Sequence, residues 1–216
     1  MLKRFFVLAV SGLSLVLMIN CGDNSTGPNE SNGSLNLNEN AGSLDNNNPG
    51  ANTPIKDSAT AATVGSTVQS QSMQAGSKAM SLMDFGMQKI KDNSMSGNID
   101  GEIEGEKSGT ATAKGTYNYN ETSGTFHYDI TCTLNNYSDD GKLFIGGQIH
   151  YLVDISINQD FEETGTYKID GKIKFNGSYI GTNTFSYDLN FSNQSYTYTS
   201  TIVSDGVTTT INMSEP

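Results

Sequence analysis

The chain of 216 residues has no tryptophan, only 2 Cys and 4 Pro, and few basic residues. Its 12 Lys and Arg stand against 23 Asp and Glu, so the net charge is -11. An acidic chain repels nucleic acid and anionic lipid headgroups, and neither is expected as its main partner. Hydrophobic residues make up only 35% of the sequence, which excludes a thick, purely aliphatic core. Aromatic side chains fill part of this gap, since there are 10 Tyr and 9 Phe.

The N-terminus carries a short positive segment, Lys3 and Arg4, followed by a nearly continuous apolar run over 5–19. As a helix this run would span roughly 22 Å, less than the ~30 Å hydrocarbon core of a bilayer. A positive start, a short apolar middle and an early position predict a secretory signal peptide over residues 1–20. The alternative is an uncleaved membrane anchor.

Cys21 follows the apolar run after a single residue, Asn20, in the sequence LMINC over 17–21. This pattern resembles the type II signal peptide of bacterial lipoproteins, in the relaxed form with Asn before the cysteine that is similar to spirochaete sequences. The resemblance implies that Cys21 becomes the lipid-modified first residue of the mature chain, which the lipid would hold at a membrane of the cell envelope. Gly22 stands where enteric inner-membrane lipoproteins carry Asp, which favours the outer membrane.

Cysteine chemistry follows from that expectation. Lipidation of Cys21 leaves Cys132 unpaired, and a lone thiol is expected to be buried in an oxidising compartment. The competing interpretation is a Cys21–Cys132 disulfide, which requires an unmodified Cys21.

Residues 21–60 form a segment rich in Asn, Gly and Ser, with no aromatic residue after the cysteine. So little apolar surface cannot offset the entropy of ordering a chain, so a disordered tether is expected.

An amphipathic helix is predicted over 61–92, because apolar residues recur at spacings of three and four. These residues are Val64, Val68, Ala75, Ala79, Met80, Met83, Met87 and Ile90. Three glycines within the segment (Gly65, Gly76 and Gly86) weaken a helix by up to ~1 kcal/mol each relative to Ala, so this helix needs a surface to pack on.

From residue 97 onward, polar and apolar residues alternate with a period of two, which is typical of antiparallel strands with one buried face. Eight strands are predicted within 97–216, at 97–106, 110–119, 125–135, 142–157, 163–175, 182–191, 195–204 and 207–213.

The turns between these strands set their register. Asp140-Gly141 places Tyr128 opposite Val153, and Asp205-Gly206 places Ile202 opposite Thr209. A three-residue loop at 176–178 would place Phe175 opposite Tyr179.

No long connection interrupts the strands, so the simplest topology is an up-and-down meander. We expect a mainly β protein in which this eight-stranded sheet is curved or forms a partial barrel. The N-terminal helix would pack on its concave face, within the same domain, where small residues such as Ala111 and Ala113 allow a close approach.

Catalytic and metal-ligating patterns are weak. His127 and His150 both fall on the polar face and are expected to be solvated. The Asp140-Gly141 turn places His127 opposite Asp154, whereas a wider loop over 135–142 would bring the two histidines together as a cation site. No nucleophile stands in a recognisable motif, so no enzyme activity, metal or cofactor is predicted.

The apolar face is unusually rich in tyrosine, whose hydroxyl needs a partner when buried. This content indicates either a thin core whose hydroxyls reach solvent or a partly open cavity. The candidate lining residues of such a cavity are Tyr117, Tyr128, Tyr151, Tyr167, Phe185, Tyr187 and Tyr198.

The sequence thus favours a non-catalytic, lipid-anchored binding or scaffold module of the cell envelope. A lipocalin-like carrier of a small apolar ligand is one alternative, by analogy of architecture alone. A surface adhesin that contacts envelope or host proteins is the second, and a small transmembrane β-barrel with its apolar face toward lipid is the third.

Overall fold

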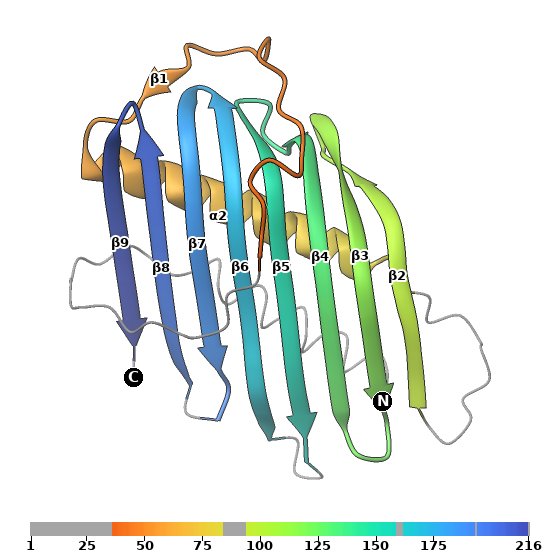
Figure 1. Ribbon diagram of the computed structural model, residues 1–216. Coiled ribbons are helices and arrows are strands. Elements are labelled where there is room, and N and C mark those ends of the chain that lie inside the picture. Colours follow the sequence, from red (N-terminus) through yellow and green to blue (C-terminus); the bar gives the residue numbers. More distant parts are fainter. Residues whose placement is uncertain (1–35, 84–93, 159–161, 193, 216) are drawn as a thin grey trace.

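The computed structural model describes residues 36–83, 94–158, 162–192 and 194–215 (Figure 1). Cys21, Met87 and Ile90 therefore lie outside the described residues. The described elements, in chain order, are β1 (Thr53–Pro54), α2 (Ser58–Met80), β2 (Ser94–Glu104), β3 (Ser108–Asn120), β4 (Thr125–Ser138), β5 (Leu143–Ile157), β6 (Glu163–Gly177), β7 (Tyr179–Asn190), β8 (Ser195–Ser204) and β9 (Val207–Glu215).

The strands β2 to β9 form one curved antiparallel sheet in which each strand pairs with the next along the chain. The sheet does not close, and β2 and β9 are its two edges. The short strand β1 adds to it separately, in parallel with the start of β7. The predicted meander of eight strands with one packed helix is confirmed.

Two of the three predicted registers are confirmed. Tyr128 pairs with Val153, and Ile202 pairs with Thr209. The histidines are not opposite each other, so the wider β4–β5 loop is wrong. A bulge near Asn136, whose φ is 52°, shifts the last pairs before this turn without changing the register below it.

The predicted β6–β7 loop is wrong by two residues. Phe175 pairs with Gly181 rather than Tyr179, because Tyr179 and Ile180 instead lie beside Thr53 and Pro54 of β1. The shift is an even number of residues, so the apolar side chains keep their face.

The helix α2 begins three residues earlier than predicted and ends earlier as well. Asp57 is its N-cap, and the side-chain oxygen of Asp57 accepts a hydrogen bond from the Thr60 backbone amide at 2.8 Å. At the other end, the amides of Ser81, Leu82 and Met83 each donate to the carbonyl three residues back. The Ser81 hydroxyl also donates to the Lys78 carbonyl, and these tighter bonds end the helix at Met80.

The helix lies across one face of the sheet, from the β9 edge to the β2 edge (Figure 1). A helix of this length extends ~34 Å, and eight strands with ~4.8 Å spacing have nearly the same width. Gly76 permits the close approach, because a Cβ at that position would lie 2.5 Å from the Tyr151 ring. The glycine that weakens the helix locally therefore allows it to pack.

Residues 36–57, which we call the strap, contradict the predicted disorder for this part of the tether. The strap crosses the polar face of the sheet at β5 and passes around its upper end to reach α2 (Figure 1). Leu37 and Ile55 are buried, with 7% and 2% of their surface exposed. Low hydrophobicity did not prevent ordering, because the strap forms its contacts with polar groups of the sheet.

Asparagine side chains hold the strap. The side-chain nitrogen of Asn136, at the bulge, donates to the side-chain oxygen of Asn48. The side-chain oxygen of Asn136 accepts from the backbone amide of Asp45. Asn48 also donates to Asn176, whose own side chain donates to the Asp45 carbonyl. The Asn-rich composition, which predicts disorder, thus supplies a hydrogen-bonded network between strap and sheet.

Candidate functional site

A polar cleft of about 390 Å³ opens between the outer side of α2 and two loops at the upper end of the sheet. Its lining residues are Ser66, Thr67, Ser70, Gln71 and Gln74 from α2, Glu106 from the β2–β3 loop, and Asp139 and Asp140 from the β4–β5 turn.

Helical periodicity explains the α2 side of the cleft. The apolar stripe that contains Val64, Val68 and Ala75 packs on the sheet. The lining residues fall beside this stripe, where Ser, Thr and Gln reach past the rim of the sheet toward the loops. The cleft is therefore polar on its helical side, although it borders the core.

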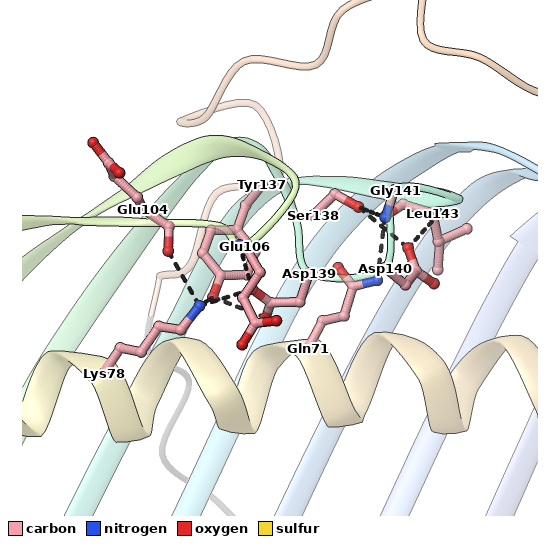
Figure 2. Close-up of polar contacts among 10 residues, drawn as sticks. All are labelled: Gln71, Lys78, Glu104, Glu106, Tyr137, Ser138, Asp139, Asp140, Gly141 and Leu143. Atoms are coloured by element: carbon pink, nitrogen blue, oxygen red, sulfur yellow. Dashed lines mark hydrogen bonds and ion pairs between the residues drawn. The ribbon is translucent and has the colours of Figure 1, made fainter.

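The β4–β5 turn is built on Asp140. One of its carboxylate oxygens accepts from the backbone amide of Lys142 at 2.8 Å. The same oxygen accepts from the backbone amide of Leu143 at 2.9 Å (Figure 2). The Ser138 hydroxyl accepts from the Gly141 amide at 3.0 Å. These bonds fix the turn and present the Asp140 carboxylate at the mouth of the cleft.

Asp139, 5% exposed at its side chain, is neutralised within the protein. Its carboxylate lies 2.8 Å from Lys78 Nζ and accepts from the Tyr137 hydroxyl and the Glu106 amide, both at 2.9 Å (Figure 2). Burial, and secondarily the Asp139 charge, raises the pKa of Tyr137 well above its ordinary value, so Tyr137 stays a hydrogen-bond donor. This cluster joins α2 to the sheet.

Gln71 is the exceptional residue of the cleft. It is 3% exposed, and its amide nitrogen donates to the Leu143 carbonyl at 3.2 Å. Its side-chain oxygen is buried and has no hydrogen-bond partner among the described residues. Figure 2 shows the Gln71 amide directed from α2 toward the turn at Asp139 and Asp140. A buried acceptor without a partner is uncommon in native structures and requires an explanation.

The seven aromatic residues predicted to line a cavity are all buried in the core. Two of them are satisfied by the helix backbone: the Tyr151 hydroxyl donates to the Ser72 carbonyl, and the Tyr128 hydroxyl is 3.4 Å from the Gly76 carbonyl. Buried tyrosine hydroxyls of the sheet thus find acceptors in the backbone carbonyls of α2, which packs close to them. None of the seven lines the polar cleft, and a cavity between them stays a prediction.

The two histidines lie apart, each beside an aspartate. His127 Nδ1 is 2.6 Å from Asp154 Oδ1, at the wall of a smaller cleft of about 270 Å³ near the opposite end of the sheet. His150 Nε2 is 2.8 Å from Asp129 Oδ1. His150 is buried, contrary to the prediction, and the strap crosses the same face at Gln148 on β5. Across the described ranges, no group of three His, Cys, Asp or Glu side chains could hold a metal ion.

Cys132 is buried as predicted, with none of its surface exposed and no disulfide. Burial raises the pKa of its thiol to about 12, so the group is protonated at neutral pH. The residue is therefore part of the core.

Comparison with known protein families, with curated proteins and with solved structures gave no match to this chain. Within the part of the chain that the structure describes, no helix has both the length and the apolar character needed to cross a membrane.

The polar cleft was missed by sequence reasoning, because its residues come from three separate segments. The sequence does predict the Asp140-Gly141 turn that forms one wall of the cleft. A signal was present in the Ser, Thr and Gln residues beside the apolar stripe of α2, but only the packed helix shows which loops they face.

Proposed function

We propose that this protein is a lipid-anchored lipoprotein of the bacterial cell envelope that acts as a non-catalytic binding module. Cys21 carries the lipid, and the β domain with its polar cleft is the part that meets a ligand. The supporting observation is the position of Cys21, one residue after a short apolar run and directly before a polar, Asn-rich segment.

The position of the strap limits the distance between Cys21 and the β domain. Because the strap contacts the sheet from Asn38 onward, only residues 22–35 separate Cys21 from the strap. Fully extended, a segment of that length reaches at most about 50 Å. The β domain is thus expected to stay close to the membrane surface, with the polar face that carries the strap nearest the attachment point.

Metabolic labelling tests the anchor. Cells that express the full chain are grown with an alkyne-tagged fatty acid, and the protein is examined for label and for its distribution between membrane and soluble fractions. We expect label and membrane association for the unchanged chain and for Cys132→Ala, and loss of both for Cys21→Ala. Label that persists in the Cys21→Ala variant, or is absent from the unchanged chain, would refute the proposal.

A further inference from the structure

We propose that the polar cleft binds an organic cation with several N–H donors, a guanidinium or primary ammonium group. The inference rests on the binding role proposed above and specifies its ligand class. It starts from the buried side-chain oxygen of Gln71, which has no partner although the nitrogen of the same amide is bonded to Leu143. A ligand that fills the cleft and donates to this oxygen would complete the amide's hydrogen bonding.

The Lys78 ammonium and the Thr67 hydroxyl already use their donors within the protein. Lys78 has three N–H donors, and they meet the Glu104 carbonyl, the Tyr137 oxygen and Asp139 at 3.1, 3.2 and 2.8 Å. The Thr67 hydroxyl donates to the Thr63 carbonyl at 3.0 Å and keeps its lone pairs free to accept. The Gln71 oxygen can only accept, so a ligand that reaches it must donate.

The charge of the cleft also favours a ligand that donates hydrogen bonds. Its lining contains the carboxylates of Glu106, Asp139 and Asp140, and only Asp139 is paired with a lysine. Glu106 is exposed, so a ligand can reach its carboxylate from solvent. The cleft is therefore net negative, which excludes anionic ligands and favours cations through charge-assisted hydrogen bonds.

The arrangement of acceptors favours an extended cation over a bare ion. The Gln71 oxygen lies at the helix, whereas Glu106 and Asp140 come from two different loops. No set of three acidic or histidine side chains converges on one point among the described residues. A planar guanidinium, which carries five donors in a fixed fork, or an ammonium on a chain can contact several of these groups at once.

Titration of the full chain in detergent, at low ionic strength, with agmatine as the probe tests this assignment. We expect saturable binding by calorimetry, weakened roughly tenfold by Glu106→Gln because one charge-assisted contact is lost. Glu102→Gln is the matched control, since Glu102 is an exposed glutamate of β2 outside the cleft, and its affinity should be unchanged. Gln71→Leu should abolish binding, because it removes the buried acceptor. Circular dichroism shows that each variant has folded.

Several outcomes would overturn the assignment. These are the absence of saturable binding, an equal loss in Glu106→Gln and Glu102→Gln, saturable binding of the neutral polyol sorbitol, and displacement of agmatine by stoichiometric Ca²⁺. An arginine-containing peptide in a parallel titration distinguishes the source of the cation. Tighter binding of the peptide assigns the cleft to a side chain of a partner protein, and tighter binding of agmatine assigns it to a free small molecule. Intact mass of the same sample reports acylation, so failure of the ligand assignment is distinguishable from failure of the lipid anchor.

Discussion

Substitution of Gly76 by alanine tests whether the helix lies as close to the sheet as the structure shows. In an exposed helix this change would stabilise by ~1 kcal/mol through helix propensity. Here the added Cβ would lie 2.5 Å from a carbon of Tyr151 and 2.8 Å from another. The ring is 1% exposed and its hydroxyl is bonded to Ser72 of the same helix, so it cannot turn away.

The magnitude follows from these opposing terms. Overpacking of a core costs about 1–3 kcal/mol, and contact with a fixed ring belongs at the upper end of that range. After the propensity gain, Gly76→Ala should lose about 2 kcal/mol, which lowers Tm by about 4–8 °C in a chain of this size. Gly65→Ala is the matched control, because the nearest atoms to its Cβ would be the end of the Ile202 side chain at 3.3 Å and the Ser200 hydroxyl at 3.4 Å.

Thermal unfolding followed by circular dichroism measures the difference. We expect the Tm of Gly65→Ala to stay equal or rise slightly. In a Tyr151→Leu background, which removes the ring, Gly76→Ala should lose most of its penalty. If Gly76→Ala raised Tm as much as Gly65→Ala does, the close contact between α2 and β5 would be refuted.

Three further predictions follow from the described contacts. Asn136→Ala removes the amide that joins the strap to the bulge, so limited proteolysis should cut within 36–57 faster than in the unchanged chain, and equal rates would contradict the network. Lys78→Met leaves the carboxylate of Asp139 buried without its cation and should destabilise by about 1–3 kcal/mol in urea, whereas Lys114→Met, at an exposed pair, should have almost no effect. Cys132 should resist alkylation in the folded protein, and rapid labelling at neutral pH would contradict its burial. The free energy of unfolding should decline from pH ~9 to 12, because the thiol ionises near 9 in the unfolded chain and near 12 in the folded one. Cys132→Ala should reduce this decline.

The strands could be predicted because their physics is local. Alternation of apolar and polar residues places Tyr128, Ile130 and Cys132 on one face whatever the rest of the chain does. Hairpin turns such as Asp205-Gly206, both with positive φ, then fix the register between neighbours.

The strap and the β6–β7 register could not be predicted, because they depend on contacts between distant segments. Composition alone predicts that the Asn-rich segment 36–57 is disordered. In the structure, Asn48 of this segment forms hydrogen bonds with Asn136 and Asn176 of the sheet. The strap also contains β1, which pairs with Tyr179 and Ile180, and the β6–β7 loop is therefore wider than predicted. Likewise, Gln71 is an ordinary polar residue of a helix until Leu143 takes one end of its amide and leaves the other without a partner.

The intact mass of the protein isolated from its native cells tests the central claim most directly. The account predicts a mature chain that begins at Cys21 and carries fatty acyl groups on that residue. A mature chain that begins at any other residue, or that begins at Cys21 without acyl groups, would contradict it.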